Sequence, residues 1–523
     1  QSLQVKKHQH CHQDNTASSG AMKTLKQCML PNLSSQSTNS STSSNSPKYP
    51  NKMAFAILRL CCNTQINHML RCYPPSITTD ACLVFDDLIS NAYLDIHQQP
   101  PLTSPNTSRL QAEANACDIE LSIKRGGLGL RKSADIRQQA FFSAAITSLN
   151  FLPNINPESL THLSFFKHII STRNTLQDYG IPVSDTPPDP ANAANRSICI
   201  PNDCRKLPAF YSKINRIQRT LSQLLESRRY RNLLSAAKAA KQRRLIARLK
   251  GRCGPGTTAW LTCHPSSNPR TFTNLEWLAA MRNRRGLTPS ENLVECKCGF
   301  SFKAHKANAN HFHSCKLFKR KAVFVRHELI NQTVIQACND AGIIASKVSK
   351  DTFSNTRKIP DGEAYFPDDL VTTDVTCSHP CAPSHLTLCE NPGKLLDNAE
   401  KKKIDKYSKW ASQNDCAFLP LACNAFGLLA ESFITYVKKI AHNATIPFHS
   451  SFSQAEWSAR VASEIFRDIS CAIQKGNARI SRQGIIFAKQ FGKMSSYHGR
   501  IASSQNFAYD VNEKKFIVRF ARL

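Results

Sequence analysis

The feature that most constrains the fold of this chain is a short segment with four potential metal ligands. Cys296 and Cys298 are separated by one residue, twelve residues lead on to His311, and Cys315 follows after three more. Zinc prefers sulfur and nitrogen ligands in a tetrahedron, and such a site holds together a segment too small to have its own core. Gly299 permits the turn that brings two closely spaced thiolates inward. The spacing therefore predicts a structural Zn²⁺ site.

Two alternatives to this ligand set remain open in the sequence. His305 and His313 lie in the same segment and compete with His311 as the nitrogen ligand. The chain also has 21 Cys in 523 residues, so Cys296, Cys298 and Cys315 could be unrelated reduced cysteines. The ligand spacing favours zinc. We therefore predict a zinc knuckle for residues 291–320.

The net charge of the chain indicates a polyanionic partner. There are 68 Lys and Arg residues against 37 Asp and Glu residues, which gives a formal charge of +31. A basic surface of this size favours nucleic acid, with a membrane surface as the weaker alternative. No apolar run reaches about 18 residues, and the N-terminus lacks a signal-peptide pattern. We expect a soluble intracellular protein, nuclear or cytoplasmic, and Gln1 suggests a piece of a longer reading frame.

Composition divides the chain into segments, and 523 residues predict two to four domains. Residues 1–50 are rich in Ser, Asn, Gln and Thr and cannot bury a core, so we expect a disordered polar tail. Apolar residues then recur at helical spacing. The expected fold class is mixed: a disordered N-terminus, an α-helical middle region, a small zinc knuckle and an α/β domain. The expected segments after the tail are a helical region 51–200, a basic helical region 201–290, the knuckle 291–320, the α/β domain 321–490 and a C-terminal tail 491–523.

The basic helical region carries the residues that we expect to bind nucleic acid. Acidic residues are nearly absent from residues 205–252, whereas Lys and Arg recur on a helix-favouring Ala and Leu background. Contacts with the phosphate backbone explain this pattern, and a solvated helix face is the alternative. The candidate residues are Arg228, Arg229, Arg231, Lys241, Arg243, Arg244 and Arg248.

Beyond the knuckle, the pattern alternates between helix and strand. It predicts a helix over 323–341, a hairpin over 357–377, a helix over 395–413, a strand over 417–421 and further helices, which together indicate an α/β domain. Asp361 and Asp374 lie on the two strands of the predicted hairpin. Two carboxylates there can converge on a divalent cation, which requires their side chains to lie within roughly 8 Å of each other. This is the chemistry of a nuclease.

Residues of the neighbouring helices complete the candidate site. Lys403 and Lys406 share one helix face, where a lysine could orient a water molecule or stabilise developing charge. The ring of Tyr407 can support the lysine beside it, which favours Lys406. Glu328, on the preceding helix, could supply a third carboxylate. The alternative is that these are ordinary strand-end aspartates and exposed helix lysines without a shared site.

Short motifs in a consistent order suggest a family. They are His68-x-Leu70-Arg71-x-Tyr73-Pro74-Pro75, Gly126-Gly127-Leu128-Gly129-Leu130-Arg131, the Cys-x-Cys-Gly…His-x3-Cys segment, Arg326-His327-Glu328, Pro360-Asp361, Asp374-Val375-Thr376, Lys403-x-x-Lys406-Tyr407 and Gly476-Asn477-Ala478-Arg479. In this order, the chain resembles the C-terminal region of non-LTR retrotransposon reverse transcriptases that carry a restriction-like endonuclease of the PD-(D/E)xK superfamily.

The resemblance implies a function and a set of site residues. In the family, the endonuclease cuts target DNA and exposes the 3′ hydroxyl that primes reverse transcription. By this resemblance, Asp361, Asp374 and the carbonyl of Val375 would bind Mg²⁺ or Mn²⁺, and Lys403 or Lys406 would be a displaced catalytic lysine. The implied partners are target DNA and the element's RNA. No polymerase core is expected in this chain, and a catalytically inactive nucleic-acid-binding remnant is the alternative.

Overall fold

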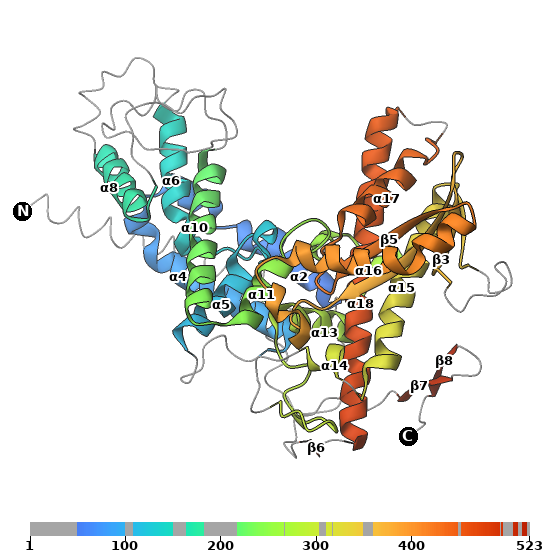
Figure 1. Ribbon diagram of the computed structural model, residues 1–523. Coiled ribbons are helices and arrows are strands. Elements are labelled where there is room, and N and C mark those ends of the chain that lie inside the picture. Colours follow the sequence, from blue (N-terminus) through green and yellow to red (C-terminus); the bar gives the residue numbers. More distant parts are fainter. Residues whose placement is uncertain are drawn as a thin grey trace, which may run out of the picture.

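The computed structural model is mostly helical and contains a small four-stranded mixed sheet (Figure 1). The structure describes residues 50–99, 108–149, 164–181, 217–265, 267–302, 310–315, 317–348, 359–447, 451–491, 493–494, 506–510 and 515–519. The expected disordered tail falls outside the described residues, except for residue 50. Within the described residues, no helix is sufficiently long and apolar to cross a membrane.

The first part of the described chain is a set of helices, most of which lie on the left of Figure 1, with α2 near the centre. They are α2 (Asn51–Leu60), α3 (Asn67–Cys72), α4 (Pro75–His97), α5 (Arg109–Glu120), α6 (Ser133–Leu149), α8 (Ser164–Asp178) and α10 (Ile217–Ala239), with short 3₁₀ turns at Cys62–Thr64 and Ile123–Arg125. Their apolar faces form two main clusters: one packs on Phe141 and Phe142 of α6, and the other surrounds Phe55, Tyr93 and Trp277. The apolar residues that recur at helical spacing in the sequence form these buried faces.

Three shorter helices connect this region to the rest of the chain: α11 (Arg243–Gly251), α12 (Ala259–Thr262) and α13 (Asn274–Arg285), with a 3₁₀ turn at Asn268–Arg270. Helix α13 starts at a capping box, in which Thr273 and Glu276 satisfy each other's backbone N–H groups. It ends at Gly286, whose φ of +70° suits glycine. Trp260 and Trp277 are fully buried with ring centroids 5.1 Å apart, and they join α12 to α13.

The mixed sheet has the strand order β2-β3-β4-β5. Its strands are β2 (Ile344–Ser346), β3 (Gly362–Tyr365), β4 (Leu370–Ser378) and β5 (Ala417–Asn424). Neighbouring strands are antiparallel except for β4 and β5, which are parallel and joined by a crossover through α16 (Pro392–Gln413). A short 3₁₀ helix, Pro383–Leu388, precedes α16. The side chain of Asn391 caps the N-terminus of α16 by accepting a hydrogen bond from the N–H of Lys394.

Helices cover both faces of this sheet. One face packs against α15 (Lys319–Asp340), α17 (Glu431–His442) and α18 (Gln454–Phe491) in the largest core cluster, which includes Val371, Val375 and Leu421. Leu396 of α16 packs on Ala422 at the other face. The predicted helices over 323–341 and 395–413, the hairpin over 357–377 and the strand over 417–421 are confirmed within a few residues. The sequence did not predict β2, because a three-residue edge strand is too short to show alternation.

The long helix α18 runs through the structure and connects its parts (Figure 1). It packs against α15 and α17, which cover the sheet, and against α12 and α13. It also packs against α14 (His311–Ser314) and β1 (Leu293–Glu295) of the knuckle. Gly484 allows the ring of Phe312 to lie directly on α18, because a Cβ there would be 2.2 Å from that ring. Strand β1 pairs with β6 (Lys493–Met494), and β7 (Asn506–Asp510) pairs with β8 (Lys515–Arg519).

Replacing Trp277 with Ala tests whether the aromatic cluster stabilises the helical part of the chain. Because the indole is fully buried, Trp277→Ala should lower the free energy of unfolding by about 3–5 kcal/mol. Leu275 lies on the same helix with 52% of its surface exposed, so Leu275→Ala should change stability by less than about 0.5 kcal/mol. Denaturant-induced unfolding followed by circular dichroism measures both values. Equal effects of the two substitutions would contradict this packing.

Candidate functional site

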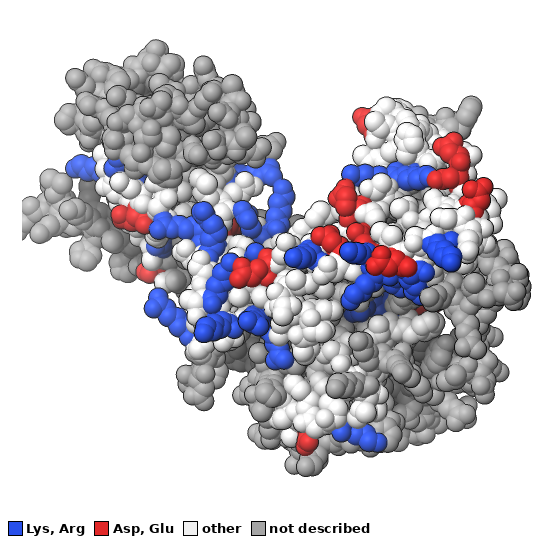
Figure 2. Space-filling model, viewed as in Figure 1, with Lys and Arg blue, Asp and Glu red and all other residues white. Residues whose placement is uncertain are grey.

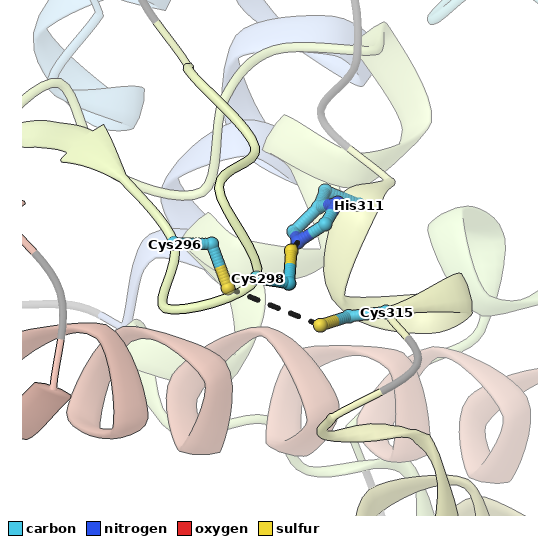
Figure 3. A group of neighbouring side chains, drawn as sticks. All are labelled: Cys296, Cys298, His311 and Cys315. Carbon is cyan, nitrogen blue, oxygen red and sulfur yellow. Dashed lines mark hydrogen bonds between the residues drawn. The ribbon is translucent and has the colours of Figure 1, made fainter.

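The four predicted ligands of the knuckle converge in one group (Figure 3). One ligand atom from each of Cys296, Cys298, His311 and Cys315 lies within 4.8 Å of the others. Cys298 Sγ is 3.3 Å from His311 Nε2, and Cys296 Sγ is 3.9 Å from Cys315 Sγ. Three sulfur atoms and one imidazole nitrogen form a set that suits zinc. The group could therefore hold a metal ion.

A tight turn after β1 brings the first two cysteines together. The N–H of Gly299 donates to the carbonyl of Cys296, and the N–H of Cys296 donates to the carbonyl of Phe300, both at 2.9 Å. Gly299 has a φ of +82°, which L-residues with a side chain rarely adopt. The second pair comes from α14 and the residue after it, which pack beside α18 (Figure 3). The glycine in the sequence pattern therefore has the role that we predicted.

Burial sets the protonation of the ligands. His311 stacks on Phe300 with ring centroids 4.1 Å apart, and desolvation lowers the pKa of His311 to about 4. Its imidazole is therefore neutral near pH 7, as metal coordination requires. Desolvation raises the pKa of Cys296 to about 12, so a bound cation would have to displace its proton. His313 does not join the group, because its Nδ1 lies 3.3 Å from Arg326, and His305 lies outside the described residues.

A second group of ligand-type side chains lies at the sheet. It contains Asp361, Asp374 and His327, whose ligand atoms lie within 4.8 Å of one another. Asp361 precedes β3 and Asp374 lies in β4, and the register of these strands places the two residues opposite each other. The N–H of Asp361 donates to the carbonyl of Thr373 at 2.8 Å, which fixes this end of the hairpin. The two carboxylates meet the distance that a shared cation requires.

Three neighbours hold the carboxyl group and backbone of Asp361. His327 Nε2 lies 2.8 Å from Asp361 Oδ2, which also accepts the N–H of Val375 at 2.8 Å. Asn331 Nδ2 donates to the carbonyl of Asp361 at 3.1 Å. Burial by itself lowers the pKa of His327, but the hydrogen bond to Asp361 and the charges of both aspartates raise it above its ordinary value. His327 therefore keeps a proton to higher pH than a free histidine.

Lys403 of α16, rather than Lys406, contacts the second carboxylate. Its Nζ pairs with Asp374 Oδ2, and the side chain of Asp374 is 3% exposed. The Nζ of Lys406 instead contacts the hydroxyl of Tyr407 and lies 4.1 Å from the ring centroid. The hydroxyl of Tyr407 donates to the carbonyl of Ile359 at 3.1 Å. The sequence-based preference for Lys406 differs from the structure because the ring that was expected to support Lys406 holds it away from Asp374.

The third member of the group is His327 and not the predicted Glu328. Glu328 pairs with Lys347 and accepts the side-chain amide of Gln332 at 2.6 Å. Consecutive residues of a helix point about 100° apart, so Glu328 and His327 cannot both face the strands. The signal that could have identified His327 was its place in the motif with Glu328. Val375 contributes its N–H to Asp361, and the expectation that its carbonyl binds a metal stays a prediction.

Several of the predicted phosphate-binding arginines are engaged within the protein. Arg229 pairs with Glu113 and Glu120, each at 2.7 Å, and lies 3.3 Å from Asp135. Buried Arg248 lies 3.3 Å from Asp118, and Arg228 donates to the carbonyl of Tyr179. Arg229 and Arg248 thus pair with carboxylates of α5 and α6, which lie outside the acid-poor segment 205–252, and their contact with nucleic acid stays a prediction.

The other predicted residues lack carboxylate partners among the described ion pairs. Arg231, Lys241 and Arg243 are exposed, and Arg244 is partly exposed. Among the described hydrogen bonds and ion pairs, the side chain of Arg231 makes only one: its Nε donates to the carbonyl of Ser227 on the same helix at 3.4 Å. Figure 2 shows Lys and Arg side chains on both sides of a hollow between the first helices and the sheet region. Helix α16, which carries Lys403, also has exposed lysines at Lys394, Lys401, Lys402, Lys406 and Lys409.

Comparison of the chain with protein-family models and with curated proteins finds no match. The two groups of side chains and the charge around them are therefore the features that indicate a function.

The ligand set of the knuckle predicts the metal content of single variants. The protein should contain about one zinc ion per chain, and Cys298→Ser and Cys315→Ser should each lower that content severalfold, because a thiolate ligand is lost. His313→Asn should retain the zinc, since His313 faces Arg326 instead. Elemental analysis by mass spectrometry measures the content. Full zinc content in both serine variants would contradict the assignment.

The exposed part of the basic region predicts a salt dependence. Replacing Arg231, Lys241 and Arg243 with Ala should reduce the slope of log affinity for duplex DNA against log salt by up to about 2.7, at about 0.9 per lost phosphate contact. Arg229→Gln is the control, because its partners are carboxylates: it should lower stability and leave the slope unchanged. Fluorescence anisotropy at several salt concentrations measures the slope. An unchanged slope in the triple variant would mean that these side chains are only solvated.

Proposed function

We propose that this chain is the metal-dependent DNA endonuclease and nucleic-acid-binding part of a retrotransposon polyprotein, with a restriction-like nuclease domain. The observation that carries this proposal is the convergence of Asp361, Asp374 and Lys403 in one group. These residues come from a hairpin and from the helix that follows it, in the order that the family resemblance requires. This convergence supports a shared site over unrelated strand-end aspartates and helix lysines.

The donor set suits a hard divalent cation. Asp361 and Asp374 offer carboxylate oxygens, which Mg²⁺ and Mn²⁺ prefer, while His327 Nε2 is bonded to Asp361. When bound there, the cation would neutralise a phosphodiester and lower the pKa of an attacking water. Without it, two carboxylates at this separation repel each other, and the ammonium of Lys403 and the imidazole of His327 offset that repulsion.

The surrounding side chains have distinct tasks in this proposal. Lys403 carries a positive charge beside Asp374, where it can stabilise charge that develops on a phosphate oxygen. His327 and the N–H of Val375 fix Asp361 Oδ2 in one orientation. Buried Tyr407 braces the residues before β3 through the carbonyl of Ile359. In this proposal Lys403 takes the role of the catalytic lysine, because the third residue of the Asp374 motif is Thr376 and has no positive charge.

Charge and the knuckle support nucleic acid as the partner. The chain has a formal charge of +31, and exposed basic residues occur on α10, α11 and α16. Basic side chains contact the phosphate groups of nucleic acid, and such contacts position a duplex without reading its sequence. The proposed partners are target DNA and the element's RNA, and the proposed compartment is the nucleus or the cytoplasm. The zinc knuckle has a structural role in this proposal.

A nicking assay tests the proposal. The chain should nick supercoiled plasmid in Mg²⁺ or Mn²⁺, and Asp374→Asn should abolish nicking with DNA binding retained. Lys403→Ala should reduce the rate constant about 10²- to 10³-fold, the typical cost of removing one group that stabilises transition-state charge. Lys402→Ala, on the same helix but exposed, is the matched control and should change the rate by no more than a few fold. Binding without nicking by the unaltered chain would instead identify an inactive remnant.

A further inference from the structure

A buried arginine connects the knuckle to the sheet. Arg326 on α15 is 2% exposed, and its guanidinium contacts three elements. Nη1 of Arg326 donates to Asn477 Oδ1 at 2.9 Å and lies 3.3 Å from His313 Nδ1. Nη2 donates to the carbonyl of Cys377 at 2.9 Å. No carboxylate pairs with Arg326 among the described residues. Its buried charge is therefore held in place by neutral acceptors, which makes their positions critical.

The three acceptors lie on three different elements that pack around Arg326. His313 lies on α14 between the ligands His311 and Cys315, so the loop that holds the metal also positions His313. Asn477 lies on α18, and Cys377 lies in β4, three residues after Asp374. Because His313 Nδ1 accepts from Arg326, its proton is on Nε2. Arg326 thus contacts both the metal-binding segment, through His313, and the strand that carries Asp374, through the carbonyl of Cys377.

The packing around this arginine allows little movement. A Cβ at Gly476 would lie 2.6–2.8 Å from atoms of Arg326, so only glycine fits against it. Asn477 is itself fixed, because its Nδ2 donates to the carbonyl of Ala425 at 2.6 Å and to Gln474 Oε1 at 3.1 Å. Gly476 and Asn477 belong to a motif of the sequence that the proposed nuclease chemistry leaves without a role. Their role is to seat the arginine.

The next residue on the helix completes the connection. His327 follows Arg326 on α15 and bonds to Asp361, so a rotation or shift of this turn moves both contacts together. A displacement of α14 would withdraw His313 from Arg326 and release this turn of α15. The carboxylate of Asp361 would then lose the partner that fixes its orientation toward Asp374. The order of one group of ligands thereby depends on the order of the other.

We propose that metal binding at the Cys296, Cys298, His311 and Cys315 group strengthens divalent-cation binding at Asp361 and Asp374, and that Arg326 is the positioning residue that couples the two sites. The proposal rests on the proposed function only in taking the aspartate group as a cation site. Coupling between two binding sites is reciprocal, so a cation at the aspartates also strengthens zinc binding. The zinc ion has no chemical step in this scheme, and its effect passes through His313, Arg326 and His327.

Manganese binding to the full chain tests the coupling. Mn²⁺ affinity is measured by electron paramagnetic resonance in the zinc-loaded protein, in zinc-free Cys298→Ser and in two variants of His313. His313→Leu removes the acceptor for Arg326 but leaves all four zinc ligands, whereas His313→Asn retains an acceptor at the equivalent position. We expect Cys298→Ser and His313→Leu to weaken Mn²⁺ binding by about 5-fold or more and His313→Asn to restore it. Unchanged Mn²⁺ affinity in His313→Leu, with zinc retained, overturns the proposal.

A second measurement separates failure of the coupling from failure of the nuclease assignment. Hydrogen exchange of the amides in residues 323–331 should slow on zinc loading in the unaltered chain and in His313→Asn, but not in His313→Leu. If the zinc-loaded chain binds no Mn²⁺, the nuclease assignment fails, and this exchange pattern alone then decides whether the loop controls α15. Equal exchange in zinc-loaded and zinc-free protein overturns the coupling. Zinc content measured in each variant ensures that a loss of metal is not mistaken for a loss of contact.

Discussion

The rest of the structure depends on the burial of one long helix. Helix α18 has 38 residues and spans about 57 Å at 1.5 Å per residue, which is enough to pass the sheet, the central helices and the knuckle. Small residues at its contact points, such as Gly476 and Gly484, allow other side chains to approach its backbone closely. Because the sheet packs at Ile473, the central helices at Cys471 and the knuckle at Ile480 of the same helix, these parts share one rigid reference. The positions of the two candidate metal groups follow from it.

Features encoded by neighbouring residues could be predicted from the sequence. The knuckle ligands lie within twenty residues, and the chemistry of zinc together with the glycine after Cys298 indicated the three cysteines, while the choice of His311 over His313 came from the structure. Asp361 and Asp374 are joined by one hairpin, so strand pairing alone places them opposite each other. Helix α16 and strand β5 carry strong periodic patterns of their own. In each case the interaction that fixes the geometry acts over a short stretch of chain.

Features set by distant partners could not be predicted. The acidic partners of Arg229 lie on α5 and α6, about a hundred residues earlier, so the local absence of carboxylates was misleading. The choice between Lys403 and Lys406 depends on the rotation of α16 over the sheet, which the two residues alone do not define. His327 replaced Glu328 for the same reason on α15. Side-chain direction on a helix is decided by packing against other elements, which one sequence does not show.

The parallel pairing of β4 and β5 has a consequence for the order of folding. A parallel pair cannot close until the crossover between its strands is in place, and here that crossover is α16, the helix that carries Lys403. The lysine therefore reaches Asp374 in the same event that completes the sheet. Chains still emerging from the ribosome before residue 417 have both aspartates but no assembled centre. In the proposed nuclease, hydrolytic competence would thus arise only in a chain whose sheet is complete.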